Sequence, residues 1–246
     1  MSTESPVIVV SSLFFYREDL GEVFLAKLWP QLVSAAEAAA YRIRLKVTLN
    51  YPASPGYATR LARVCETAPR SGEAMVEIIS RGWNAGFGAG HNAAFARDHS
   101  DFFVVLNSDL FCEQSDWLAG MIGAFADPAV ALVGAAENAS VLRRSDGCGL
   151  PAPTPDAFDF VDGSLLAFRS TDARCLGLFH PDYRNFYFED SDLCLRYRQA
   201  GRKVTAISLP HQHLRYGSTM LVPRRVIRRI LDDNRGAFFA RWGDFM

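Results

Sequence analysis

The sequence lacks the features that mark several common classes of protein. Its 26 Lys and Arg residues are balanced by 27 Asp and Glu residues, which leaves a net charge of −1 and no global basic field to attract nucleic acid. No apolar run approaches the length of a membrane span, and the polar N-terminus lacks the basic flank of a signal peptide. We therefore expect a cytoplasmic protein that does not bind nucleic acid.

Paired cysteines are also missing. The five cysteines are odd in number and contain no CxxC pair, which argues against a disulfide framework and against a cysteine zinc site. This number and spacing of cysteines are typical of a protein in a reducing compartment. Because 49% of the 246 residues are hydrophobic, the chain can bury a full core, and an α/β chain of this length commonly forms one domain.

Short apolar runs alternate with helical patterns along the chain. Buried strands are expected at residues 6–10, 44–49, 74–79, 102–106, 130–134 and 165–168. Helices are expected at residues 21–40, 91–97 and 191–200. This alternation predicts an α/β fold with a mostly parallel central sheet flanked by helices. Such sheets bind ligands beyond the carboxyl ends of their strands.

A glycine-rich segment follows the third expected strand. Gly86 and Gly88 would let the backbone approach a ligand, and the following helix offers free N–H groups to an anion. The alternative is a tight turn that only joins strand to helix. The segment is not a dinucleotide fingerprint, because His91 stands where that motif needs its third glycine, although Asp109 lies about 20 residues further on.

Polar residues follow three of the expected strands. Ser11 follows the first, Asn50 the second, and Asn107, Ser108 and Asp109 follow the continuous apolar run that is typical of a central strand. A carboxylate at such a strand end can hold Mg²⁺ or Mn²⁺, which shares its oxygen ligands with substrate phosphates. The alternative for Asp109 is a turn residue that accepts backbone hydrogen bonds.

Three acids lie within four residues, at Glu189, Asp190 and Asp192, between aromatic residues and an expected helix. Their mutual repulsion needs a cation, a proton or a helix N-terminus to compensate it. Asp190 or Ser191 could be the N-cap of that helix. Since one cap needs one side chain, capping explains Glu189 and Asp190 less well than a function does.

Two further polar groups are candidates for a site. Asp162, Gly163 and Ser164 precede the strand expected at 165–168. His213 lies late in the chain, where a histidine can bind a metal or contact a diphosphate. The alternative for His213 is a hydrogen-bonded structural residue.

Taken in this order, these segments resemble glycosyltransferase family 2, an inverting group with the GT-A nucleotide-sugar fold. Residues 84–92 are similar to the glycine-rich segment of its rhamnosyltransferase-like members. Residues 106–109 resemble their form of the DXD metal motif, and residues 188–196 resemble the family's ED segment. The resemblance runs from about Pro6 to Ser218.

The resemblance implies a role for each candidate residue. Asp109, with His213, would bind Mg²⁺ or Mn²⁺, and Asp190 would be the catalytic base. The implied donor-binding residues are Ser11, Asn50, Asn84, Gly86, Gly88, Asn107 and Ser108. The implied residues on the acceptor and sugar side are Asp162, Gly163, Ser164 and Glu189. Asn50 stands near a position where many members carry a base-reading aspartate, so the nucleotide stays open.

The implied function is transfer of a sugar from a nucleotide-diphosphate donor to a glycan hydroxyl with inversion. The donor would be dTDP-rhamnose or a UDP-sugar, and the acceptor a glycan of bacterial surface polysaccharide synthesis. Three alternatives are an NAD-type oxidoreductase, a nucleotidyltransferase and a non-catalytic sugar-binding module on the same fold.

The expected domains are a catalytic domain over residues 1–222 and an amphipathic helical tail over residues 223–246. The tail interleaves apolar residues with Arg224, Arg225, Arg228 and Arg229. Such a helix could dock on an anionic surface at the inner face of a membrane and bring a lipid-linked glycan to the site. The alternative is an ordinary packed helix with a solvated basic face.

Overall fold

The computed structural model describes residues 5–67, 72–154, 156–214 and 221–243. Its centre is a sheet of seven strands: β1 (Val7–Phe14), β2 (Arg42–Leu49), β3 (Ala74–Ser80), β4 (Phe102–Leu106), β6 (Val130–Ala135), β10 (Leu165–Arg169) and β11 (Lys203–Ile207). The strand order is β11-β6-β10-β4-β1-β2-β3. Only β10 runs antiparallel to its neighbours in this sheet. The expected α/β fold with a mostly parallel sheet is confirmed.

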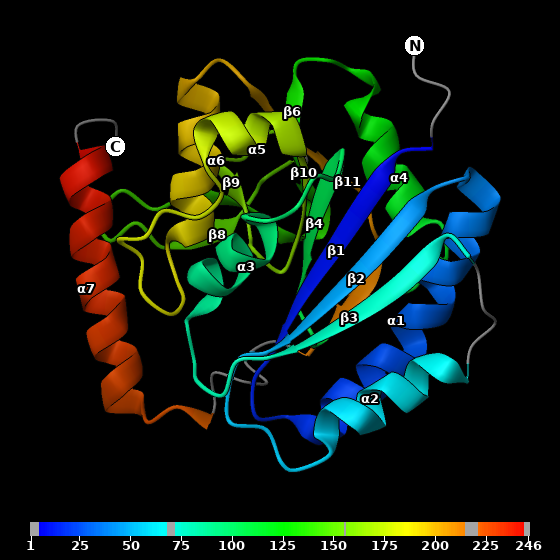
Figure 1. Ribbon diagram of the computed structural model, residues 1–246. Coiled ribbons are helices and arrows are strands. Elements are labelled where there is room, and N and C mark those ends of the chain that lie inside the picture. The colour runs from blue at the N-terminus through cyan, green and yellow to red at the C-terminus, as the bar shows by residue number, and fades with distance from the viewer. Residues whose placement is uncertain (1–4, 68–71, 155, 215–220, 244–246) are drawn as a thin grey trace.

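Helices cover both faces of this sheet (Figure 1). They are α1 (Glu18–Ala39), α2 (Tyr57–Glu66), α3 (Phe87–Phe95), α4 (Trp117–Gly123), α5 (Ser170–Leu176), α6 (Glu189–Gln199) and α7 (Arg224–Trp242), with short 3₁₀ turns η1 (Ala124–Ala126) and η2 (Ala136–Asn138). Successive strand residues face opposite sides. Val10 therefore joins the core under α1, α2 and α4, and Val9 joins the core under α3, α5 and α6.

Two small antiparallel sheets lie beside the main one. In the first, β5 (Leu110–Cys112) pairs with β12 (His211–His213). In the second, β7 (Ala139–Leu142) lies between β8 (Gly149–Pro151) and β9 (Phe160–Val161). The pairing of β5 with β12 sets His213 opposite Leu110, so it carries a late histidine to the residue that follows Asp109.

Three expected boundaries are wrong. β1 does not end at Val10, because its whole length pairs in register with β2 through Phe14. α3 begins at Phe87 rather than at 91. α6 begins at Glu189, and its N-cap is Phe188, not Asp190 or Ser191, so neither of these side chains caps the helix.

The C-terminal helix α7 packs against the segment that precedes α6. Phe238 and Trp242 form a separate buried cluster with Tyr183 and Phe188, and Figure 1 shows α7 on the side of the molecule away from α1 and α2. The division into domains at 222 and 223 stays a prediction, and Ser218 lies outside the described residues. Within the described ranges, no helix is both long and apolar enough to cross a membrane.

Candidate active site

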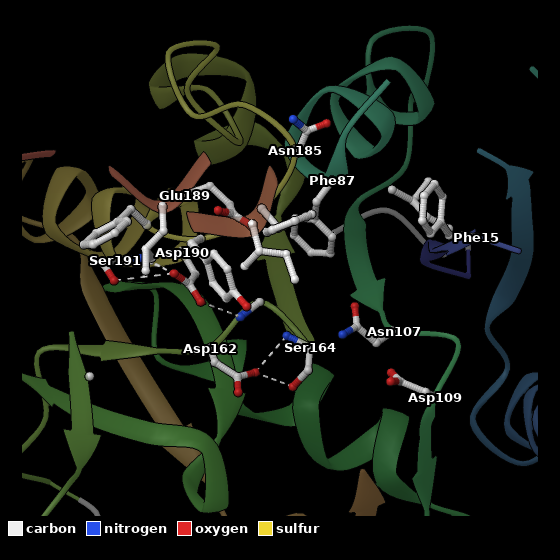
Figure 2. A pocket seen from close by; sticks show the side chains of 18 of the residues that line it. Phe15, Phe87, Asn107, Asp109, Asp162, Ser164, Asn185, Glu189, Asp190 and Ser191 are labelled. Carbon is white, nitrogen blue, oxygen red and sulfur yellow. Dashed lines mark hydrogen bonds between the residues drawn. The ribbon is translucent and has the colours of Figure 1, made fainter. Parts of the chain in front are cut away.

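A cavity of about 580 Å³ brings most of the candidate residues together. It lies beyond the carboxyl ends of β1, β2 and β4, where Leu13, Asn50 and Asn107 line it. The predicted site residues that line it are Asn50, Asn84, Asn107, Ser108, Asp109, Asp162, Gly163, Ser164, Glu189, Asp190 and His213. Figure 2 shows Asn107 and Asp109 on one side of the cavity and Asp162, Glu189 and Asp190 on the other. The cavity therefore has two chemically different ends.

At the first end, the residues suit a divalent cation. Nε2 of His213 lies 3.3 Å from Oδ1 of Asp109, and both side chains are largely buried. Nδ1 of His213 is buried without a hydrogen-bond partner in the described part of the chain. Among the described residues, no group of three or more His, Cys, Asp or Glu side chains has an arrangement that could hold a metal ion. The protein thus offers two ligands, and Mg²⁺ typically takes its remaining ligands from water and substrate phosphates.

The two residues before Asp109 are held by the neighbouring strands. The backbone N–H of Asn107 donates to the carbonyl oxygen of Ser164 at 2.8 Å. Oγ of Ser108 donates to the carbonyl oxygen of Leu13 at 3.1 Å. These bonds fix the loop after β4 and keep Asp109 at the floor of the cavity, as the apolar strand before it predicts.

Asn50 and Asn84 form the turn beside this end. Nδ2 of Asn50 donates to Oδ1 of Asn84 at 3.0 Å and to the carbonyl oxygen of Gly86 at 3.2 Å. Oδ1 of Asn50 accepts from the backbone N–H of Ala85 at 3.0 Å. Both amide hydrogens of Asn50 are therefore engaged within the protein, although its side chain still lines the cavity.

Oδ1 of Asn84 accepts two hydrogen bonds, one from Asn50 and one from the N–H of Gly86 at 2.8 Å. These two bonds orient the amide, because the oxygen must face the turn. Its Nδ2 group makes no hydrogen bond to the described residues, and Asn84 lines the cavity. Asn84, rather than Asn50, thus offers donor hydrogens to a ligand.

Ser11 does not line the cavity, contrary to the prediction. It lies inside β1, fully buried, with its hydroxyl hydrogen-bonded to Nδ1 of His91 at 2.9 Å. Burial lowers the pKa of His91 to about 3, so this imidazole is neutral. The pair joins β1 to α3 and satisfies the buried hydroxyl of Ser11.

Gly86 and Gly88 are also absent from the cavity wall. A Cβ atom at Gly86, where φ is +87°, would lie 2.9 Å from the backbone of Asn185, and one at Gly88 would lie 2.7 Å from Cβ of Phe179. The two glycines permit close approach to protein rather than to a ligand. The alternative of a connecting turn fits Gly86, the N-cap of α3, whereas Gly88 lies in the first turn of that helix.

At the second end, Asp190 points into the cavity (Figure 2). Its Oδ2 accepts from the backbone N–H of Gly163 at 3.1 Å, and its Oδ1 accepts from the N–H of Ser191 at 2.8 Å. Burial, followed by the negative charge of Asp162, raises the pKa of Asp190 to about 6. The carboxylate is ionised at neutral pH but is a stronger base than an ordinary aspartate.

The other residues at this end are engaged to different degrees. Glu189 is buried, and its Oε2 has no hydrogen-bond partner among the described residues. Burial and the charge of Asp190 raise the pKa of Glu189 well above its usual range. The hydroxyl of Ser164 donates to Asp162 and accepts from Nδ2 of Asn138, so it is occupied within the protein.

The third acid of the cluster, Asp192, points away from the cavity and is fully buried. Its Oδ1 accepts from the hydroxyl of Tyr183 at 3.1 Å, from Arg241 at 2.9 Å and from Nε1 of Trp242 at 3.0 Å. Its Oδ2 accepts from Arg196 at 2.7 Å. The three acids therefore separate into a carboxylate in the cavity, a buried acid with a raised pKa and a structural ion pair.

Sequence reasoning missed an apolar wall of the cavity. The aromatic segment 186–188 lines it together with Ile227 and Leu231 of α7. A signal was present, because Ile227, Leu231, Asn234 and Phe238 follow one another at helical spacing. The single polar residue in that apolar stripe, Asn234, is buried.

Comparison with known proteins identifies a matching family model and a shared fold. The family model described as Glycosyl transferase family 2 matches residues 59–147, a segment that contains Asn84, Asn107 and Asp109 but not Asp190 or His213. No curated protein sequence matches the chain at a significant level.

Solved structures share the fold at low sequence identity. A mannosyltransferase from Pyrobaculum calidifontis in complex with GDP-Man and Mn²⁺ is 19% identical with a TM-score of 0.62, over 84% of this chain and 56% of that one. Glucosyl-3-phosphoglycerate synthase from Mycobacterium tuberculosis, in complex with Mn²⁺ and UDP, is 13% identical with a TM-score of 0.61, over 97% and 80%. TarS from S. aureus is 11% identical with a TM-score of 0.56, over 97% and 74%. The chain thus spans little more than half of the Pyrobaculum protein.

Proposed function

We propose that the chain is a member of glycosyl transferase family 2, whose model matches residues 59–147, and that it transfers a sugar from a nucleotide-diphosphate donor to a glycan hydroxyl with inversion at the anomeric carbon. Its GT-A fold, shared with nucleotide-sugar transferases of known structure, supports the proposal. The observation that carries the proposal is the two-ended cavity. It holds Asp109 and His213 at one end and Asp190, with its pKa raised to about 6, at the other.

Asp109 and His213 would hold Mg²⁺ or Mn²⁺ at the donor end. The contact between Nε2 of His213 and Oδ1 of Asp109 supports this assignment. When bound, the cation would neutralise negative charge on the leaving diphosphate. Two of the similar structures contain Mn²⁺ with a nucleotide or a nucleotide sugar.

Asp190 would accept the proton of the attacking hydroxyl. A base is most effective when its pKa lies near the working pH, and the pKa of Asp190 meets that condition. The N–H groups of Gly163 and Ser191 orient its carboxylate. Glu189, which lines the cavity and whose Oε2 has no partner among the described residues, would hydrogen-bond a sugar hydroxyl.

The donor is proposed to be dTDP-rhamnose or a UDP-sugar. Thymine and uracil both present carbonyl oxygens, and the free Nδ2 hydrogens of Asn84 suit such an acceptor. The fold itself does not select the nucleotide, because the similar structures carry GDP-Man in one case and UDP in another.

The acceptor is proposed to be a glycan of bacterial surface polysaccharide synthesis, free or lipid-linked. Four exposed arginines on the first half of α7, Arg224, Arg225, Arg228 and Arg229, make no ion pair with the described residues. They support a peripheral contact with an anionic membrane surface. Binding to vesicles with anionic lipid but not to neutral vesicles, lost when the four arginines are replaced by glutamine, would support this contact. Equal binding to both vesicles would exclude it.

The test of the proposed function is a transfer assay with a panel of nucleotide sugars, each with Mg²⁺, Mn²⁺ or a chelator. We expect turnover with one thymidine or uridine donor, dependence on metal, and a product of inverted anomeric configuration by NMR. Reduction of NAD would instead indicate an oxidoreductase, and turnover of a sugar phosphate with a nucleoside triphosphate would indicate a nucleotidyltransferase. Nucleotide-sugar binding without turnover would indicate a non-catalytic module.

A further inference from the structure

The loop before α6, residues 184–188, has an unusual backbone. Asn185, Tyr187 and Phe188 have positive φ angles of 62°, 78° and 73°. Asparagine tolerates this left-handed region, but bulky aromatic residues rarely adopt it because Cβ approaches the backbone. A segment with two aromatic residues in this conformation persists only where its surroundings hold it. Glu189 and Asp190 follow directly, so this loop determines where their side chains begin.

One side chain of α7, Asn234, makes several hydrogen bonds to the backbone of this loop. Oδ1 of Asn234 accepts from the backbone N–H of Arg184 at 3.0 Å. The two hydrogens of Nδ2 of Asn234 are shared among three carbonyl oxygens, those of Arg184 at 3.0 Å, Phe186 at 2.9 Å and Tyr187 at 3.1 Å. Asn234 is 1% exposed, and none of these bonds goes to another side chain. The Asn234 amide therefore contacts the loop through its backbone alone.

The opposite side of the loop rests on the start of α3. The carbonyl oxygen of Asn185 accepts from the N–H of Phe87 at 2.6 Å. Gly86 permits this approach, because a Cβ atom there would lie 2.9 Å from the Asn185 backbone. The loop is thus held between α7 and the glycine-rich turn that also carries Asn84.

We propose that Asn234 is a positioning residue, whose amide holds the 184–188 loop in its left-handed conformation and so places Glu189 and Asp190 in the cavity. The role of Asn234 in transfer rests on the proposed function of Asp190. Asparagine suits the position because it combines one acceptor with two donor hydrogens. An aspartate has a similar volume and can accept from Arg184, but as a carboxylate it would face three carbonyl oxygens with no hydrogen to donate.

The test compares Asn234→Ala and Asn234→Asp with the parent chain. We expect amide hydrogen exchange across residues 184–191 to accelerate by at least about tenfold, because the loop opens more often. We expect kcat for transfer to fall by about 100-fold, since a small displacement of a catalytic group is enough for such a loss. Metal-dependent binding of the nucleoside diphosphate, measured by calorimetry, should stay within about twofold because the donor end is held by other residues.

Two control variants separate this role from a general loss of stability. Asp233→Ala changes an exposed neighbour on α7 and should leave exchange and kcat as in the parent. Leu118→Ala removes a buried side chain of α4, and it should lower the unfolding temperature without changing kcat. Retained nucleotide binding verifies that each Asn234 variant is folded.

Parent-like kcat in either Asn234 variant would overturn the proposal, as would an equal loss of kcat in Leu118→Ala. Unchanged exchange across 184–191 would also overturn it. If the parent chain transfers no sugar, the proposed function fails by itself, and hydrogen exchange still decides whether Asn234 holds the loop.

Discussion

At the donor end of the cavity, Asp109 lies 3.3 Å from an imidazole nitrogen. At the acceptor end, Asp190 has only backbone N–H groups and the hydroxyl of Ser191 as partners among the described residues. Asp162 and Glu189 add further acidic groups beside it. In the proposed function, the first end would receive a cation, whereas the second would receive a proton. Asp109 would then serve the leaving diphosphate and Asp190 the attacking hydroxyl.

The largest effect should come from the acceptor end. Asp190→Asn keeps the shape of the side chain but removes the base, so kcat should fall by about 1,000-fold. Nucleoside-diphosphate affinity in the presence of metal should be unchanged, as measured by calorimetry. A variant that retains turnover would show that the acceptor end does not supply the base.

The donor end should show the opposite pattern. Asp109→Asn should weaken metal-dependent nucleotide binding by about 100-fold, and His213→Ala by about 10-fold, because the cation loses a ligand in each case. Calorimetric titrations with Mn²⁺ and with chelator provide the measurement. If the parent chain binds the nucleotide equally well without metal, the two ends do not differ in the proposed way.

The pH dependence of kcat should report the ionisation of Asp190 at the acceptor end. Since the pKa of Asp190 is raised to about 6, the base is ionised above that pH and becomes protonated as the pH falls through it. At saturating substrate, kcat should fall by nearly tenfold per pH unit below about 5.5. A kcat profile that stays flat down to pH 4.5 would contradict the raised pKa of Asp190 and would indicate that another group is the base.

The smallest expected effect is a gain in stability. The folded-state pKa of Asp190, about 6, lies above its ordinary value of 3.8, so the folded state binds this proton more tightly than the unfolded state does. That contribution to stability is complete below about pH 4 and is lost as the pH rises through 6. At pH 7, Asp190→Asn should therefore raise the free energy of unfolding by on the order of 1 kcal/mol, after allowance for its partial exposure. Urea unfolding at pH 7 and pH 5 measures it, and a gain that does not shrink at the lower pH would argue against ionisation as its cause.

The donor end was largely readable from the sequence. A continuous apolar run followed by Asn107, Ser108 and Asp109 predicts a buried central strand with polar groups at its carboxyl end. Such features depend on residues that are adjacent in the sequence, so a local sequence pattern is enough to predict them. The glycine-rich turn was recognised for the same reason. The sequence could not predict that Gly86 lies against Asn185 or that Gly88 lies against Phe179, because these contacts join distant segments.

The sequence alone determined the α/β architecture, the order of its strands along the chain and the concentration of acids near residue 190, because periodicity and composition act locally. Only the tertiary structure decided that β12 carries His213 to Asp109, that Asp192 leaves the cavity for an ion pair, and that Asn234 of α7 meets the loop before α6. These contacts join segments that are distant in sequence. The packing of the whole chain sets them, and no local pattern of residues encodes which distant partner each side chain will meet.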